Sequence, residues 1–403
     1  MRLPLLIALL TSTATAGEIR VPADQPDLAT ALAVAAPGDV IRVQTPADQA
    51  PASGASLLVD KPVTIVGEPV CRIDLQGFGL PADGGLKLAG PGHGEVVLMG
   101  VELSYQVGFE DGMPSLAGGG FDALRLYDCK ILHDNFTPTG AITRAFPAVE
   151  LAGVAELTVV GSELLGGWRY SDTCIPTFLH GNGEAGIEAP GTSVLLVDSS
   201  VTGGSGGGSV EYWLAACPTD LDSLPGVGGD GVVAAELHSW NTTITPGAGT
   251  QVWVDPIGFC SSGMIFCGTS SNGQPYIVGG TVSVNGCSRL THASSRVPLG
   301  GVWQLDWDPV GAGCLPSLAG CGTCPAFLFV DLAAPGSPID FAGSWVYLNP
   351  GTAFLALNFP SNLPFSALLP VPPIPVLAGL EVSAQVMIGT GALSGPVSGV
   401  LAP

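Results

Sequence analysis

A short pattern of alternating apolar residues recurs along most of this chain and constrains its fold more than any other feature. In one copy, Leu157, Val159, Ser162 and Leu164 fall on the same face of an extended chain. The spacings between successive copies are 33, 28, 33, 37, 43 and 45 residues. A constant core at irregular spacing is typical of a solenoid whose coils carry loops of different length. The copies begin at Val63, Val96, Leu124, Leu157, Val194, Leu237 and Val282.

A second short apolar strand precedes several copies, at residues 86–88, 149–151, 187–189 and 232–234. Each coil therefore reads as strand, tight turn, strand, small-residue corner, apolar residue and variable loop. Stacking would bury the inward side chains, and each buried Leu or Val contributes roughly 1.5–3 kcal/mol. We expect Asp to disrupt the stack locally at Val159 or Leu196, and to be tolerated at Thr158.

The copies differ in how well they match at the small inward position. The first copy is weak there, because it places Glu68 at that position and Val70 at the following apolar one. Cys129 and Cys287 occupy the same inward position in two other copies. We therefore interpret these two cysteines as buried free thiols.

Residues 1–16, MRLPLLIALLTSTATA, have the features of a signal peptide. Arg2 supplies the positive charge, residues 3–10 are apolar, and residues 14–16 form a small-x-small cleavage site. The apolar run is too short to span a bilayer, and no later segment is both long and free of Pro and charge. The sequence predicts a protein that is exported, secreted or displayed on the cell surface, and not membrane-spanning.

The next segment has the pattern of an entry to the solenoid. Residues 19–21 and 40–43 are predicted strands, and residues 26–36 a short helix between them. The helix would direct Leu28, Ala31, Leu32 and Ala35 to one side. A solenoid exposes its core at its ends, so we predict a capping helix here.

After residue 294 the repeat stops and Pro becomes frequent. Residues 327–332, 344–348, 354–359 and 380–388 alternate or run apolar between turn signals, as antiparallel strands do. The predicted organisation is all-β: a signal peptide (1–16), a parallel β-helix domain with its capping helix (17–293) and a small antiparallel β-sandwich (294–403).

The charge balance excludes one class of partner. The chain contains 12 Lys and Arg residues and 34 Asp and Glu residues, which gives a formal net charge of −22. Such a surface repels phosphate backbones, so nucleic acid is not an expected partner. The carboxylates would attract Ca²⁺, although solubility alone also explains an acidic surface.

Ten cysteines, an even number, suit an oxidising compartment. Cys260 and Cys267 enclose six residues, as do Cys314 and Cys321, so we expect local disulfides within these short loops. Cys321 and Cys324 also form a Cys-x-x-Cys motif, for which a redox role is the alternative.

The two longest variable loops lie in consecutive coils, between Leu164 and Ile187 and between Val201 and Val232. They should lie side by side on one flank, where their similar Cys174 and Cys217 segments predict a disulfide that joins them. This flank gathers the candidate site residues. Those for sugar stacking are Trp168, Tyr170, Tyr212 and Trp213; those for acid–base or proton-abstraction chemistry are His180, Glu184, Glu211 and Arg169; those for Ca²⁺ are Asp220, Asp222 and Asp230.

Two simpler interpretations stand beside these roles. The long loops could merely cover the flank of the solenoid, with solvated carboxylates and inward aromatic rings. His238, close to a strand, is interpreted as a structural histidine.

Residues 19–43, with Pro37-Gly38-Asp39 before a strand, resemble the entry segment of secreted right-handed parallel β-helix proteins of the pectin-lyase-like superfamily. The resemblance extends over the coils, roughly residues 19–290. Residues 377–386 resemble part of a terminal β-sandwich found in many secreted proteins of environmental bacteria. The resemblance implies a right-handed coil and a polysaccharide or cell-surface glycan as ligand.

The same resemblance shows what catalysis would require. Superfamily hydrolases that act on polygalacturonate use Asn-x-Asp, Asp-Asp, Gly-His-Gly and Arg-x-Lys, and this set does not occur here in order. Calcium-dependent lyases need a basic residue, and Arg169 is the one basic residue in the long loops. The first hypothesis is therefore a non-catalytic protein that binds glycan or builds an envelope or adhesion layer. The alternative is a polysaccharide lyase or glycoside hydrolase.

Overall fold

The computed structural model describes most of the chain from residue 17 onward, and the predicted signal peptide lies outside this part. The described residues are 17–50, 56–77, 85–107, 114–134, 146–167, 182–206, 210–212, 226–249, 251–254, 265–269, 271–285, 290–292, 296–308, 324–332, 339–341, 344–346, 348, 352–374, 377, 380–388, 394 and 396–402.

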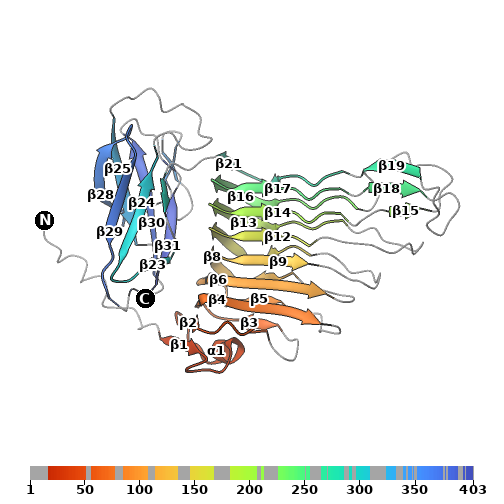
Figure 1. Ribbon diagram of the computed structural model, residues 1–403, viewed down its shortest axis with the longest axis horizontal. Helices are drawn as coiled ribbons and strands as arrows, with labels where there is room; N and C mark the ends of the chain where they lie inside the picture. The colour runs from red at the N-terminus through yellow and green to blue at the C-terminus, as the bar shows by residue number, and fades with distance from the viewer. Residues whose placement is uncertain are drawn as a thin grey trace.

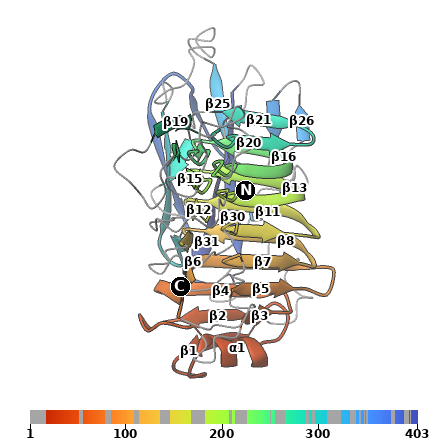
Figure 2. The ribbon, with the colours of Figure 1, turned by 90° about the vertical axis from the view of Figure 1, so that its right-hand side faces the viewer.

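An 18-stranded, parallel-paired sheet winds through the first part of the chain and forms a stack of coils (Figures 1 and 2). Each coil contributes to up to three ladders, an arrangement that fits a parallel β-helix. The first ladder contains β1 (Glu18–Val21), β2 (Val40–Val43), β4 (Thr64–Gly77), β6 (Glu95–Val107), β8 (Phe121–Tyr127), β11 (Val154–Val160), β13 (Ile187–Val197), β16 (Val232–Trp240) and β21 (Val282–Asn285).

The two other ladders are built from shorter strands and from the ends of the long ones. The second runs through β3 (Leu57–Val59), β5 (Leu86–Ala89), β7 (Leu116–Gly119), β10 (Val149–Leu151), β13, β16 and β20 (Tyr276–Val278). The third runs through the ends of β4 and β6 and then through β9 (Lys130–Asp134), β12 (Glu163–Leu165), β14 (Ser200–Thr202) and β17 (Thr243–Thr245).

The register confirms the repeat that the sequence predicts. Leu124 pairs with Val96 and Leu157, and Leu157 in turn pairs with Val194. Val194 pairs with Leu237, and Leu237 with Val282. The inward residues of successive coils form one continuous buried cluster, so each coil covers the apolar side chains of its neighbours.

In the first copy of the repeat, the predicted inward positions Glu68 and Val70 are wrong. Cys71 and Ile73, in place of Glu68 and Val70, pair with Val101 and Leu103. β4 shifts register between Val66 and Cys71, which leaves Glu68 on the outside. There its carboxylate forms an ion pair with Arg42 and accepts a hydrogen bond from Gln44 Nε2 at 2.9 Å.

A ladder of small polar side chains explains the small-residue corner. The backbone N–H of Cys129 donates to Ser162 Oγ at 3.0 Å, and that of Ser162 donates to Ser199 Oγ at 3.2 Å. The preceding residues Asp128 and Asp198 have φ near +50°, which turns the chain sharply. A small hydroxyl or thiol therefore fits inside the corner and satisfies the backbone of the coil before it.

The predicted helix forms at the N-terminal end of the stack, as α1 (Leu28–Val34) (Figure 1). Asp27 caps it by accepting the Thr30 N–H at 2.7 Å. Leu28, Ala31 and Leu32 are buried in the core of the coils. Among the described residues, no helix combines the length and apolar character that crossing a bilayer requires.

The second part of the chain, which we call the C-terminal module, contains a five-stranded and a three-stranded sheet. The first consists of β23 (Arg296–Pro298), β31 (Val397–Ala402), β30 (Glu381–Ile388), β25 (Pro325–Asp331) and β28 (Phe354–Pro360). The second consists of β22 (Leu290–His292), β24 (Val302–Trp307) and β29 (Phe365–Pro370). A separate hairpin joins β26 (Ile339–Phe341) to β27 (Ser344–Val346).

The two larger sheets share one buried cluster, to which β24 contributes Trp303, Leu305 and Trp307 and β25 contributes Leu328 and Val330. The β22 residues 290–292 precede the expected boundary at 293, yet they pair with β24 of the module. The module lies beside the stack of coils (Figure 1). Its Val400 is buried in one cluster with Met99 and Tyr127 of the first ladder.

Candidate functional site

Glycine-rich segments cross one flank of the stack, where the sequence predicts long variable loops. We call them the glycine legs: residues 166–167, 182–186, 203–206, 226–231, 246–249 and 271–274. The legs at 203–206, 246–249 and 271–274 lie next in sequence to the strands β15 (Val210–Tyr212), β18 (Gln251–Val254) and β19 (Ile265–Thr269), which are at the far right of Figure 1. The prediction that both long loops leave from one flank is therefore confirmed for the described parts of these loops.

Hydrogen bonds link outgoing and returning legs in alternation. Gly204 N donates to Glu184 O at 2.8 Å, and Gly229 N donates to Gly204 O at 2.7 Å. Gly247 N continues the series by donating to Gly229 O at 2.8 Å. The legs thus form two layers of extended chain that are bonded to each other through their backbones.

Other bonds join equivalent legs of successive coils at every third residue. Gly183 and Gly186 donate to the next returning leg at 2.8 and 3.0 Å, and Gly203 and Gly206 donate to the next outgoing leg at 2.9 and 2.8 Å. A three-residue period is that of a polyproline II helix, which has three residues per turn. In this period, the two layers resemble packed chains of polyproline II type more closely than a pleated β-sheet.

This packing requires glycine. A Cβ on Gly183 would overlap the carbonyl oxygen of Gly204, and one on Gly204 would overlap that of Gly167. The sequence carries a signal for this arrangement that was not recognised beforehand. Gly183, Gly228 and Gly273 are spaced by 45 residues and occupy successive returning legs.

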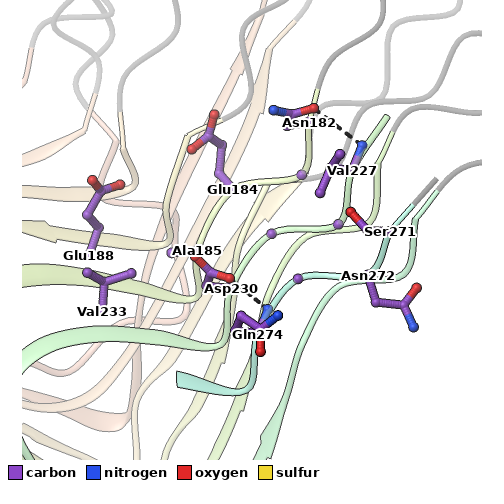
Figure 3. A pocket seen from close by; sticks show the side chains of 14 residues that line it. Asn182, Glu184, Ala185, Glu188, Val227, Asp230, Val233, Ser271, Asn272 and Gln274 are labelled. Atoms are coloured by element: carbon purple, nitrogen blue, oxygen red, sulfur yellow. Dashed lines mark hydrogen bonds between the residues drawn. The ribbon is translucent and has the colours of Figure 1, made fainter. Parts of the chain in front are cut away.

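The returning legs of three consecutive coils form a shallow cavity of about 450 Å³, which we call the flank groove (Figure 3). Its walls combine backbone from the legs with side chains from the strands that follow them. The side chains that line it are those of Asn182, Glu184, Ala185, Glu188, Val227, Asp230, Val233, Ser271, Asn272 and Gln274.

The groove is polar and carries negative charge. Glu184, Glu188 and Asp230 contribute carboxylates, and neither a cationic nor an aromatic side chain is among the described lining residues. Asp230 Oδ1 accepts the backbone N–H of Gln274 at 2.7 Å, and Asn182 Oδ1 accepts that of Val227 at 3.3 Å (Figure 3). These two side chains therefore bind successive coils together, while Glu184 and Glu188 are half-buried in the wall.

The structure brings two of the predicted site residues, Glu184 and Asp230, into this groove. It places Glu211 and Tyr212 in β15, beyond the legs, where β15 pairs with β18. The other candidates, Trp168, Arg169, Tyr170, His180, Trp213, Asp220 and Asp222, lie outside the described residues. Within the described part of the chain, no group of three His, Cys, Asp or Glu side chains could hold a metal ion.

The cysteine predictions are tested only in part. Cys129 is a buried thiol outside any disulfide, as predicted, and Cys71, two coils nearer the N-terminus, is a second buried thiol. Burial raises the pKa of Cys71 to about 12, so this thiol stays protonated at neutral pH. Cys324 is disulfide-bonded, and Cys267 lies in β19. The predicted Cys174, Cys217, Cys260, Cys287, Cys314 and Cys321 lie outside the described residues.

A buried serine–histidine pair was not anticipated. Ser115 Oγ lies 3.2 Å from His133 Nδ1 and donates to Leu132 O at 3.1 Å. Neither residue is exposed to solvent, and Phe146 packs against the imidazole edge. The serine hydroxyl is therefore out of reach of a substrate, and the imidazole lies against Gly167 at the base of the glycine legs.

His238 has the environment of a structural histidine. It is buried on β16, between Leu195 and Ser283 in register. Burial lowers its pKa, with a smaller opposing effect from Glu236. The ring is neutral at physiological pH and does not line the flank groove.

A scan against models of known protein families finds no match, and a search of curated proteins finds none either. Among solved structures, the chain is similar to the full-length tailspike protein 2 (TSP2, ORF211) from Escherichia coli O157:H7 bacteriophage CAB120, at 11% sequence identity and a TM-score of 0.16. The match covers 90% of this chain and 55% of the tailspike, so the chain spans about half the length of that protein. A likeness this weak carries no weight for function.

Proposed function

We propose that this chain is a secreted or surface-displayed right-handed parallel β-helix protein that binds an extracellular glycan in the flank groove without cleaving it. One observation carries the proposal: three consecutive coils supply the polar side chains of a single open groove. Strands of adjacent coils are about 4.8 Å apart. A linear polymer that lies across the coils would meet a new set of acceptors at each step.

The chemistry of the groove indicates an uncharged or amine-bearing glycan. Sugar hydroxyl and ammonium groups donate hydrogen bonds, and carboxylate and amide oxygens accept them. The groove presents carboxylate oxygens on Glu184 and Glu188, and the amide of Asn272, whose Oδ1 also accepts the Gly249 N–H at 2.8 Å. The chain as a whole carries a net charge of −22. A polyuronate is itself negatively charged, so the carboxylates of the groove and the net negative charge of the chain would both repel it.

The backbone around the groove also suits binding. Its legs are held by hydrogen bonds from both layers, for example Gly183 N to Val227 O at 2.8 Å and Gly228 N to Ser271 O at 3.1 Å. Because these hydrogen bonds already order the walls, binding does not require a loss of conformational entropy from ordering a loop.

The alternative is a carbohydrate-active enzyme that acts at the same place. It is supported by the three carboxylates in one groove, since glycoside hydrolysis generally uses a pair of them. The Asp230 carboxylate in addition holds the backbone of the next coil by accepting the Gln274 N–H at 2.7 Å.

Binding is tested by co-sedimentation of the mature protein with an uncharged glucan, with chitosan and with polygalacturonate. We expect retention on one of the first two and none on polygalacturonate. Glu184→Gln combined with Glu188→Gln should weaken retention about tenfold or more, equivalent to the loss of one or two hydrogen bonds. Asp60→Asn, an exposed change directly after β3, serves as the control.

The same samples are assayed for new reducing ends and for unsaturated products, with and without Ca²⁺. Cleavage that depends on Glu184 would establish the enzyme in place of the binding protein. Retention that is unaffected by the double substitution would refute the flank groove as the site.

A further inference from the structure

The C-terminal module covers part of the outer face of the first ladder. Val400 of β31 is 1% exposed and belongs to one buried cluster with Val97, Met99 and Tyr127 of the coils. Tyr127 also reaches the module through its hydroxyl, which lies 3.1 Å from Ser398 Oγ. The interface therefore has an apolar part and a polar part, and Tyr127 and Ser398 are both fully buried.

The polar part is centred on one buried guanidinium. Arg125 Nε lies 3.0 Å from Glu95 Oε2 and 3.2 Å from Glu381 Oε2 of the module. Arg125 Nη2 lies 3.6 Å from Glu156 Oε2, and Nη1 donates to Thr158 Oγ1 at 2.7 Å. The expected tolerance of Asp at Thr158 assumes an exposed side chain, and this premise is wrong: Thr158 is 2% exposed and its hydroxyl accepts a hydrogen bond from Arg125.

Three carboxylates thus share a single cation. Glu381 is buried, and its Oε1 has no hydrogen-bond partner among the residues that the structure describes. An ionised carboxylate in this position loses its hydration and gains only a part of the attraction of Arg125. When the module separates from the coils, Glu381 regains water and loses this constraint.

We propose that proton uptake at the Arg125–Glu381 contact controls how tightly the C-terminal module docks on the coils. The module is held most tightly in acid, and its contact with the first ladder weakens as the pH rises.

The sign follows from linkage. Burial, opposed by Arg125 and assisted by Glu95, raises the pKa of Glu381 from 4.5 to about 8 in the docked state. The docked form therefore keeps a proton that the separated form has lost, and the docking constant falls about tenfold per pH unit between these two values. Below about pH 4.5 and above about pH 8 this group adds no further pH dependence.

The other groups around Glu381 do not reverse this trend. Arg125 and Tyr127 come from β8, Glu95 from β6 and Glu156 from β11. Burial lowers the pKa of Arg125, but Glu381 and Glu95 outweigh it and raise the value. Burial also raises the pKa of Tyr127 well above its ordinary value. Neither Arg125 nor Tyr127 titrates between pH 5 and 8.

Oxidation of Met99 by hydrogen peroxide, read by peptide mass spectrometry, measures opening of the interface. Met99 is fully buried beside Val400, whereas Met387 of the module is half-buried elsewhere and provides the internal reference. We expect the Met99 rate to rise from pH 5 to pH 8, by up to about tenfold per unit, while the Met387 rate stays level.

Glu381→Gln reproduces the shape of the protonated side chain and should keep Met99 slow to oxidise at both pH values. Glu95→Gln removes one competing carboxylate and should reduce the change between pH 5 and 8. Glu163→Gln, exposed on β12, should behave like the unmodified protein. A flat Met99 profile in the unmodified protein, or the same pH profile with Glu381→Gln, would overturn the proposal. A thermal melt at pH 5 verifies that each variant is folded.

Discussion

The packing of the glycine legs leads to a sharp prediction for Gly204→Ala. The added Cβ would lie well within 3.0 Å of the carbonyl oxygen of Gly167, a separation that real Cβ atoms essentially never show. The neighbouring atom is backbone, so no flexible side chain can move aside. One leg must therefore shift relative to the other.

The size of the effect follows from what such a shift disrupts. Gly204 takes part in two interlayer bonds, from its N–H to Glu184 O at 2.8 Å and from Gly229 N to its carbonyl at 2.7 Å. Each such bond contributes about 0.5–1.5 kcal/mol net. Overpacking a closely packed site costs typically about 1–3 kcal/mol. We expect a loss of about 2–5 kcal/mol in the local stability of the legs.

Gly191→Ala is the matched control. Its Cβ would meet no heavy atom within 4 Å, and its φ is outside the left-handed region. Because alanine narrows the unfolded ensemble, this change should be neutral or stabilising by up to about 1 kcal/mol.

Hydrogen exchange of residues 182–206 and 226–249 is the appropriate assay, since a stack of coils can open locally without global unfolding. With Gly204→Ala, the amides of Gly229 and Gly247 should exchange about 30-fold or more faster, which corresponds to about 2 kcal/mol. Equal protection in Gly204→Ala and Gly191→Ala would refute the two-layer packing.

Three further changes test the coils. Ser162→Ala removes the acceptor of the Cys129 N–H and should cost about 1–3 kcal/mol by urea unfolding, whereas Ser200→Ala should change little; equal effects would contradict the corner ladder. Leu196→Ala, fully buried, should cost about 2–5 kcal/mol, against almost none for the exposed Leu58→Ala. Asp27→Ala should lower the melting temperature through a loss of about 0.5–2 kcal/mol at the α1 N-cap, and an unchanged melt would argue against this cap.

Several features of the fold could be predicted from the sequence because they depend on local geometry. Side chains of a strand alternate between two faces, so the pattern at Leu157 and Val159 already identifies the inward residues. The spacings of the copies then set which residues pair, because each inward position must lie above its counterpart in the next coil. The helix at residues 28–34 follows equally from Asp27 and the apolar side formed by Leu28, Ala31 and Leu32.

The candidate site was only partly predictable. Glu184 and Asp230 were placed on the correct flank because they flank the long loops in the sequence. Asn272 and Gln274 were missed. The signal that places their leg beside residues 227–230 is the 45-residue spacing of Gly183, Gly228 and Gly273, and no motif within residues 271–274 shows it. The Gly-rich segments were recognised as turns and approaches, whereas their two-layer packing depends on carbonyl groups many residues away.

What the sequence by itself determined is the winding: the inward face of each coil, the pairing of one coil with the next and the helix at the entry. What only the tertiary structure decided is the position of Glu68 outside the stack, the mutual contact of the glycine legs and the docking of Glu381 on Arg125. The physical reason is the range of the interactions. Apolar alternation repeats within a few residues, whereas a buried charge has a counterion whose place in the chain no local pattern specifies, and Arg125 and Glu381 meet across more than 250 residues.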